Sequence, residues 1–505
     1  MPRSRKLSTG TRDHRTTTGT APTTETAATP DDRTTTGAAA TGGEPAYGDL
    51  PPEGRAALRG GVVGNYVDQL HIFLPLVALA PALGTLAGPH ATAGTGALVV
   101  LAMLLGRPVG GMIFGAIADR WGRTRTTRLA IAGTAACSFG IAAVPSHEVI
   151  GPLAITLVLL LRFVGGVFIA GEYSAAIPLA MEWSRPRRRG LFSGLIMSMA
   201  PWAQATIAFV TGVLLVLLGQ DAYAAWGWRM SFVAGGLASV AMLIYYRRNV
   251  TDAPVFRAAQ RVEGEGSADR GEQGGGVARP RLVEVMFGRY RGAFWTMFGL
   301  MTGLWFLTQM TVIALPGWLR DEVGLDAMQV SWAMGIAAVG QAIVMSLTGH
   351  LSTITGRRRF YLLWGTLAAL AGPAVFWWTI GQREMAMVAL GAVVLQGVTV
   401  TAYGPIGAYL SERLTTAVRS TGYGTAYSLS IVAPALFPFY LPPLQAVFGD
   451  LAPVLALIVL GGVIVIICAA IGPALRPEDL EGDVEEVARR ASARSLTNGR
   501  ARVPG

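Results

Sequence analysis

The stretch that decides the fold is "GRPVGGMIFGAIADRWGRTRTTR", residues 106–128, which begins in apolar sequence and ends in a cluster of arginines. Arg107 lies within the apolar part, and Asp119 lies at the edge of the basic cluster. An apolar block that ends in arginines is typical of a transmembrane helix that leaves the bilayer on its cytoplasmic side. The stretch therefore predicts a membrane-spanning segment with one charge in its interior.

The composition extends this interpretation to the whole chain. Of its 505 residues, 52% are hydrophobic and 14% are charged, and the mean hydropathy is +0.45, whereas soluble domains carry about a quarter charged residues. The apolar residues come in blocks of about 20, long enough to cross a bilayer as a helix. We expect an all-α membrane protein with twelve transmembrane helices, at 59–82, 92–117, 127–145, 151–181, 191–218, 229–246, 292–318, 328–352, 360–380, 385–410, 419–446 and 451–474.

A long polar loop divides these helices six and six, which is how transporters with internal repeats are organised. The predicted parts are a disordered tail (1–54), an N-terminal six-helix bundle (55–246), a cytoplasmic linker (247–291), a C-terminal six-helix bundle (292–474) and a second tail (475–505). The Thr-, Ala- and Gly-rich first tail is too polar to bury a core. The second tail contains "PEDLEGDVEEVARRASAR" and predicts a short acidic-then-basic helix.

The two halves share a turn. "GAIADRWGRTR" (115–125) and "GHLSTITGRRR" (349–359) both read Gly, six residues, Gly, Arg, at the same place in each half. The second copy has Thr353 where the first has Asp119. We therefore expect any charge latch at this end to be one-sided, with Asp119→Asn slowing the cycle more than a change at Thr353.

Arginines cluster in the loops that follow even-numbered spans, which places both termini in the cytoplasm of a multi-pass plasma-membrane protein. The arginine clusters that set this topology account for the net charge of +10. We therefore expect no nucleic-acid partner. The cysteines, Cys137 and Cys468, form no disulfide framework or metal-ligand spacing. We expect no metal and no cofactor, and a monomer in the lipid bilayer.

Charges inside the predicted spans are confined to the first half. An ionisable group in the bilayer is costly and is kept where it lines a cavity or has a partner. The first half carries Asp68, Arg107, Arg162 and Glu172, and the second half has instead Gln309, Gln341, Gln396, Tyr403, Tyr423 and Tyr427. The four charges either neutralise one another as buried pairs that fix helix packing, or they act in transport.

The transport interpretation gives each type of charge a task. A buried carboxyl binds a proton more readily, and a nearby arginine opposes this, so Asp68 and Glu172 are candidate proton-coupling groups. The planar guanidinium of Arg107 or Arg162 suits a carboxylate. The expected partners are therefore protons and a small organic anion or zwitterion.

Two motifs indicate a known superfamily. "GAIADRWGR" resembles the signature after helix 2 of the major facilitator superfamily, and "LRFVGG" resembles its helix 4 motif. The chain further resembles the metabolite–proton symporter family in the stretches "RPVGGMIFG", "GGVFIAGEYSAA", "RRRGLFSG", "WGWRMSF", "TDAPVF" and "SERLTTAVRSTGYGTAYSLS". The resemblance implies two six-helix bundles that move by alternating access and proton-linked transport of a metabolite.

The resemblance also implies roles for individual residues. Asp68, Arg107, Arg162, Glu172 and Arg419 fall on the family's helix 1 aspartate, helix 2 arginine, helix 4 cation, Gly-Glu-aromatic glutamate and the arginine before helix 11. The candidate substrate-binding residues are Arg107, Arg162, Asn65, Tyr66, Gln309, Tyr403 and Tyr427. The candidate cytoplasmic gate comprises Gly115, Asp119, Arg120, Gly122, Arg123, Glu182, Arg357 and Arg419.

Departures from the family pattern bear on the substrate. Asn65 and Tyr66 replace a typical Glu-Trp, Gly165 replaces a glutamine, and Thr353 replaces an aspartate. The substrate site is therefore predicted to be remodelled, and none of the family's known substrates is carried over.

Other functions are weighed against this one. The only lysine is Lys6, which excludes a GxxxxGK[ST] phosphate loop, and no nucleophile–base spacing indicates an enzyme. A non-transporting receptor on the same fold stays open. The main alternative is a proton antiporter that exports a metabolite or drug, although the fifth span has a lone Pro201 and no Gly-Pro pair.

Overall fold

Each predicted apolar block forms helical structure in the computed structural model, which describes residues 50–88, 93–258, 281–475, 477–480, 482 and 484–500. Residues from Leu50 onward form one compact unit. Most of the predicted N-terminal tail and the middle of the predicted linker (1–49 and 259–280) lie outside the described residues. The bounds predicted for the two bundles and for the linker stay predictions.

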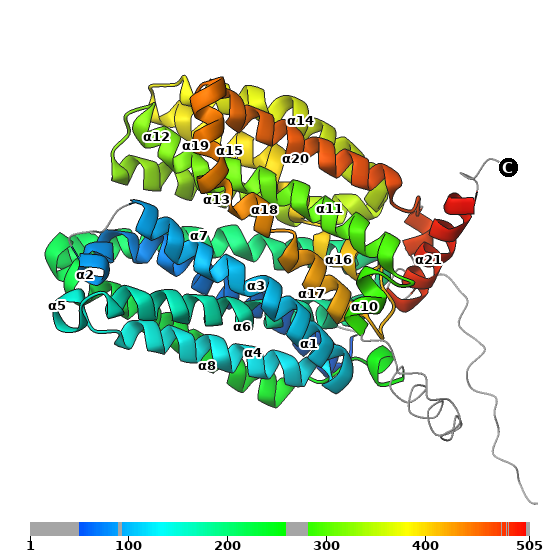
Figure 1. Ribbon diagram of the computed structural model, residues 1–505. Coiled ribbons are helices and arrows are strands. Elements are labelled where there is room, and N and C mark those ends of the chain that lie inside the picture. The colour runs from blue at the N-terminus through cyan, green and yellow to red at the C-terminus, as the bar shows by residue number, and fades with distance from the viewer. Residues whose placement is uncertain are drawn as a thin grey trace, which may run out of the picture. The chain divides into compact units, whose positions relative to one another are not determined.

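Six long helices form each half (Figure 1). In the first they are α1 (Pro52–Phe73), α3 (Ala93–Trp121), α4 (Arg123–Ala143), α6 (Leu153–Trp183), α7 (Pro186–Ala222) and α8 (Trp228–Asn249). In the second they are α11 (Arg291–Thr308), α13 (Ala327–Thr355), α14 (Arg357–Ile380), α15 (Met385–Thr399), α17 (Arg419–Leu429) and α20 (Ala452–Ile471). The other helices are α2 (Leu83–Ala87), α5 (His147–Ile150), α10 (Arg281–Met286), α12 (Leu315–Asp321), α16 (Ile406–Ser411), α18 (Val432–Ala435), α19 (Phe437–Phe448) and α21 (Val484–Arg500).

By length and hydropathy, the described part of the chain holds nine candidate membrane spans, or ten if the bent first segment counts as one. One of the nine runs from Pro186 to Asn249 and contains both α7 and α8, which are separated at Gly219, where φ is 77°. α4 is not among them, because its arginines, threonines and small residues lower its hydropathy. Counting the bent first segment as one span, separating α7 from α8 and adding α4 gives the twelve predicted spans.

The first and seventh spans are interrupted at equivalent places. α1 is followed by the π-helical turn Leu74–Ala78, and α11 by the π-helical turn Gln309–Ala314. Pro75 lies in the first turn and Pro316 lies two residues after the second, and proline lacks the N–H that continues an α-helix. Such π-turns often occur at functional sites. Both turns contribute to the cavities described below.

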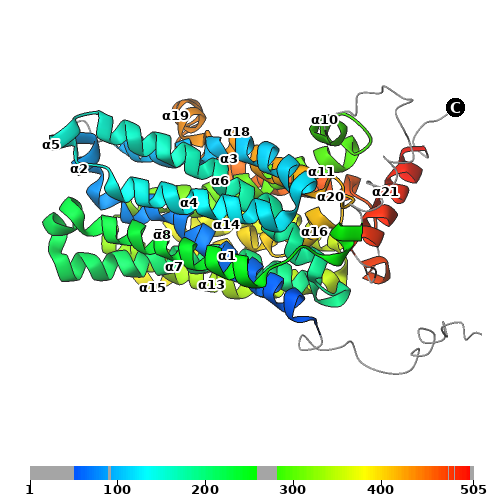
Figure 2. The same ribbon diagram turned by 90° about the horizontal axis from the view of Figure 1, so that it is seen from below.

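The most extensive contacts between the two bundles are made by two helix pairs, α3 with α17 and α7 with α13. Both pairs require glycine. A Cβ added to Gly111 would lie 2.4 Å from the carbonyl oxygen of Gly424, and a Cβ added to Gly349 would lie 2.3 Å from that of Gly190. The bundles are therefore in close backbone contact toward one end, which we call the arginine-rich end. There α10, α16, α17 and α21 gather, whereas α2 and α5 lie at the opposite end (Figures 1 and 2).

Candidate functional site

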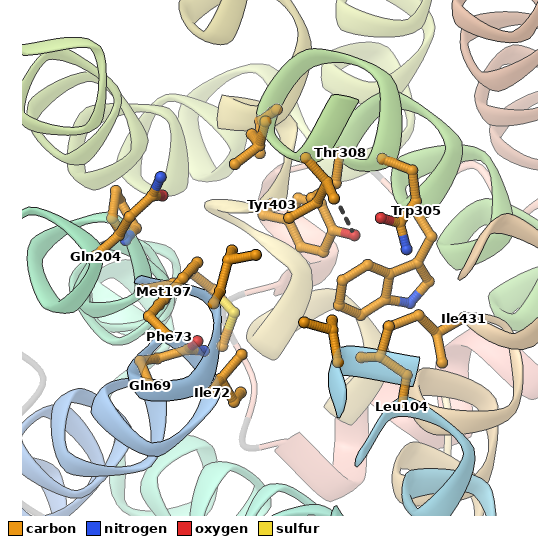
Figure 3. A pocket seen from close by; sticks show the side chains of 18 of the residues that line it. Gln69, Ile72, Phe73, Leu104, Met197, Gln204, Trp305, Thr308, Tyr403 and Ile431 are labelled. Atoms are coloured by element: carbon orange, nitrogen blue, oxygen red, sulfur yellow. Dashed lines mark hydrogen bonds between the residues drawn. The ribbon is translucent and has the colours of Figure 1, made fainter. Parts of the chain in front are cut away.

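A small cavity of about 120 Å³ lies between the bundles, and side chains of both bundles line it (Figure 3). Its polar and aromatic lining residues are Gln69, Phe73, Arg107, Tyr173, Gln204, Trp305, Thr308, Gln309, Gln341, Tyr403 and Tyr427. Three of the predicted substrate-binding residues in the second half, Gln309, Tyr403 and Tyr427, are among them. We call it the central cavity.

A larger cavity of about 1270 Å³ adjoins the central cavity toward the opposite end. The two share the lining residues Leu76, Val100, Leu104, Gln309 and Ile313. The larger cavity reaches the exposed residues Asp321, Glu322 and Asp450. The bundles are therefore separated at that end and closed at the arginine-rich end.

Arg107 is the one permanently charged side chain that lines the central cavity among the described residues. Its guanidinium lies 5.3 Å from the ring centres of Tyr173 and Trp305 and 5.4 Å from that of Tyr427. Such cation–π contacts hold a cation without neutralising it. Nε and Nη2 of Arg107 are buried and have no hydrogen-bond acceptor within the described part of the chain. Arg107 is therefore positioned to donate to a bound anion.

Asp68 on α1 and Glu172 on α6 are neighbouring carboxyls that interact with each other. Two like charges in contact oppose each other's ionised form. Both residues are buried, at 2% and 3% exposure. Their chain neighbours, Gln69 and Tyr173, line the cavity and are joined by a hydrogen bond from the Gln69 amide to the Tyr173 hydroxyl.

Three other predicted substrate-binding residues do not line the central cavity. Arg162 donates from Nη1 to the His71 carbonyl oxygen at 2.9 Å and from Nη2 to Met103 Sδ at 2.7 Å. The Asn65 amide donates to the Ile196 carbonyl oxygen, and the Tyr66 hydroxyl donates to Thr206 Oγ1 at 2.8 Å. Together these bonds connect α1, α3, α6 and α7 within the first bundle. Within the described residues, Arg162 forms no ion pair with a carboxylate.

The predicted gate residues meet at the arginine-rich end. Asp119 accepts hydrogen bonds from the backbone N–H groups of Ser420 (3.0 Å) and Thr421 (2.8 Å), at the N-terminus of α17. A carboxylate is favourable there, because the first N–H groups of a helix are unpaired and partly positive. Asp119 also lies 3.7 Å from Arg123 Nη2. This carboxylate thus connects the two bundles.

Glu182 forms a second connection between the bundles. It accepts from Arg123 of its own bundle at 2.9 Å and from Arg419 of the other bundle. Gly115 packs against the backbone of Ser420. Arg120 lies at the exposed end of α3.

Gly122 ends the first repeated turn with φ of 103°, and Gly356 ends the second with φ of 82°. Both glycines are the N-caps of the following helices, α4 and α14. This geometry is the structural basis of the repeat in the sequence.

The expectation of a one-sided latch is wrong, because Glu412 supplies a second acid. Glu412 Oε2 accepts from Arg357 Nε at 3.1 Å and Oε1 from Arg357 Nη2 at 2.9 Å. Arg189 of the first bundle lies 3.4 Å from the same carboxylate. Burial raises the pKa of Glu412, but Arg357 and Arg189 outweigh this effect and hold the pKa below its usual range. The carboxylate therefore stays ionised at neutral pH.

The sequence contains a signal for this pair. Glu182 precedes Arg189, and Glu412 precedes Arg419, in both cases with six residues between. In the structure each of these arginines reaches the glutamate of the other bundle. The two connections are therefore related by the internal repeat, and Glu412, rather than Thr353, is the acid of the second half.

The C-terminal segment covers the closed end. Glu485 of α21 accepts from the backbone N–H and the hydroxyl of Thr416, both at 2.6 Å, and from Arg419 at 3.2 Å. Arg189 donates to the Gly482 carbonyl oxygen at 3.2 Å. Apolar residues of the segment are buried: Leu480, Val484, Val487, Ala488 and Ala491. The predicted helix in this tail is confirmed, and the segment contacts arginines of both bundles.

We expect Glu412→Gln to open the arginine-rich end, because it leaves Arg357 and Arg189 buried without a counter-charge, which costs several kcal/mol. In a background without Cys137 and Cys468, maleimide labelling of a Ser420→Cys reporter should speed up by at least about tenfold. Glu384→Gln, an exposed residue at the opposite end, is the matched control. Equal labelling rates in the two variants would contradict the role of Glu412.

The model of the Major Facilitator Superfamily matches residues 69–313 and 297–503. The chain therefore belongs to this superfamily, and it is a secondary transporter that crosses the inner or plasma membrane several times.

Several known transporters are similar in sequence. YhjE, an inner membrane metabolite transport protein of Escherichia coli (strain K12), is 28% identical over 350 residues, which cover 68% of this chain and 76% of YhjE. OusA of Dickeya dadantii (strain 3937), a glycine betaine/proline/ectoine/pipecolic acid transporter, is 27% identical over 393 residues, 76% of each chain. The alpha-ketoglutarate permease of Escherichia coli (strain K12) is 28% identical over 340 residues, 67% of this chain and 74% of the permease.

Among solved structures, the proton:xylose symporter XylE bound to 6-bromo-6-deoxy-D-glucose superimposes with a TM-score of 0.67 at 15% identity. The match covers 87% of this chain and 99% of XylE. At this level of identity the likeness concerns the fold alone.

Proposed function

We propose that the protein carries a small organic anion or zwitterion across the membrane together with protons. The observation that carries this proposal is Arg107, which lines the central cavity, has buried Nε and Nη2 donors without an acceptor among the described residues, and interacts electrostatically with Asp68. Relatives whose names specify metabolites, betaine, proline and alpha-ketoglutarate support a substrate of this class.

The coupling follows from competition for Arg107. Arg107 interacts electrostatically with Asp68 and therefore favours an ionised carboxyl pair. A substrate carboxylate that binds Arg107 offsets this effect, so the pair holds its proton more firmly when substrate is present. Substrate and proton thus favour each other's binding, which is the thermodynamic requirement for symport.

The arginine-rich end is assigned to the cytoplasm, with both termini on that side, because positive charge is retained there during insertion. The conformer with its large cavity at the opposite end is then the outward-open state. The two residues of helix 1 that depart from the family pattern, Asn65 and Tyr66, do not support export by antiport. They pack against α7 and do not face the cavity. Arg162 is assigned to positioning α1 through His71.

Purified protein in liposomes tests this proposal. With an imposed gradient of one pH unit, acid outside, we expect accumulation of a transported carboxylate up to about tenfold per coupled proton. A protonophore should abolish the accumulation, and liposomes without protein are the control. Binding without any flux would instead indicate a receptor, and accumulation driven by a gradient of the opposite sign would indicate antiport.

A further inference from the structure

Two buried polar groups without partners line the central cavity, one from each bundle. From α3 come the Nε and Nη2 donors of Arg107, and from α13 comes the Oε1 acceptor of Gln341. The side chains are 2% and 4% exposed, and neither group has a hydrogen-bond partner among the described residues. Such groups are costly to leave unpaired, so a ligand that pairs them binds more tightly.

Neighbouring polar groups of the cavity are already engaged. The Gln69 amide donates to Tyr173, Thr308 donates to the Tyr403 hydroxyl at 3.4 Å, and the Trp305 indole donates to the Tyr427 carbonyl oxygen at 3.3 Å. The Thr308–Tyr403 bond is drawn in Figure 3. Among the fully buried polar atoms of the lining residues, the unpaired ones require an acceptor for Arg107 and a donor for Gln341.

We propose that the substrate is a small carboxylic acid that carries at least one N–H or O–H donor, an amino acid or a hydroxy acid. Its carboxylate accepts from Arg107, and its ammonium or hydroxyl group donates to Gln341 Oε1. This inference rests on the proposed function and narrows its substrate class. It makes Gln341 the specificity-determining residue, because Gln341 Oε1 needs a hydrogen-bond donor and a fully methylated ammonium has no hydrogen to donate.

The same geometry gives the substrate a mechanical role. Arg107 belongs to the first bundle and Gln341 to the second, so a molecule bound to both connects the bundles across the central cavity. An acid without a donor binds only the first bundle. Such an acid occupies Arg107 without favouring closure of the cavity, and it therefore acts as an inhibitor rather than as a substrate.

The test is a methylation series on one carbon skeleton. Purified full-length protein is titrated with alanine, N-methylalanine, N,N-dimethylalanine and N,N,N-trimethylalanine, and with lactate and propionate. Binding is followed by the thermal shift of the protein. The first three zwitterions keep an N–H and should bind alike. The trimethyl compound should bind about 5- to 150-fold more weakly, the cost of one buried acceptor left unpaired, and propionate should likewise be weaker than lactate.

Two variants assign the effect to Gln341. Gln341→Leu should remove the difference in binding affinity between the dimethyl and trimethyl compounds, which we call the step. Gln341→Glu, which keeps an acceptor oxygen, should retain this difference. A trimethyl compound that binds the wild-type protein as well as the dimethyl compound overturns the inference, as does a step that persists in Gln341→Leu.

The outcome also separates this inference from the function on which it rests. If the carboxylates bind and are transported, but the dimethyl and trimethyl compounds bind equally well, only the role of Gln341 is overturned. Absence of binding by every member of the series, in the wild type and in both variants, counts against the carboxylate site itself and overturns both proposals.

Discussion

Arg107→Gln reduces the affinity for the transported acid by at least about 30-fold and abolishes its accumulation. Removing one partner of a desolvated, hydrogen-bonded charge pair costs about 2–5 kcal/mol, and a cost of about 2 kcal/mol is already roughly 30-fold. The cation–π contacts with Tyr173, Trp305 and Tyr427 are lost with the charge. The measurement is substrate binding and gradient-driven uptake in liposomes.

Two variants isolate the contribution of Arg107. Arg107→Lys keeps the charge but not the planar fork, and it should recover part of the binding. Arg125→Gln, an exposed arginine after the first repeated turn, should behave as the wild type and controls for the loss of a positive charge. Full accumulation by a folded Arg107→Gln protein would contradict the assignment of Arg107 to the substrate carboxylate.

The second prediction concerns the proton. Asp68→Asn should lose accumulation driven by a pH gradient while retaining exchange of substrate across the membrane. An asparagine amide can donate to the Glu172 carboxylate, so the variant removes the titratable group at position 68 but keeps a polar partner for Glu172. Accumulation should fall from up to about tenfold per pH unit to equilibration, whereas counterflow into liposomes preloaded with substrate continues.

Glu172→Gln is the informative comparison, because it alters the other member of the pair and should leave part of the gradient dependence if Asp68 is the main proton-responsive group. Glu148→Gln, in the exposed turn at α5, controls for the loss of an acidic residue. Gradient-driven accumulation in Asp68→Asn equal to that of the wild type would remove Asp68 from the coupling mechanism.

The repeat and the helices were predictable because both follow from local chemistry. Hydropathy marks a span wherever a helix must satisfy its own backbone in lipid, and the glycine that ends each repeated turn adopts a φ that favours this residue. α17, α18 and α19 show the limit of this signal. The sequence predicts one continuous span there, but the structure interrupts it at positions 430–431 and 436, near prolines.

The site was less predictable, because a charge inside a span has a direction that sequence does not give. Arg107 and Arg162 look alike in the sequence, but one lines the cavity and the other turns toward His71. Glu412 was overlooked because its partners, Arg357 and Arg189, lie 55 and 223 residues away. Gln341 and Gln396 are both polar residues in predicted spans, and each has a buried oxygen without a partner, but only Gln341 lines the cavity.

The paired glutamates at the arginine-rich end determine which sign of charge is uncovered when that end opens. When that end opens, Glu182 stays paired with Arg123 and Glu412 stays paired with Arg357, because each of these ion pairs lies within one bundle. The arginines that reach across to the glutamate of the other bundle are Arg189 and Arg419. Neither glutamate is left without a counter-ion, and Arg419 retains Glu485 of α21, so Arg189 is the cation that loses its carboxylate partner. An acid leaving the cavity at that end thus passes a newly uncovered positive charge.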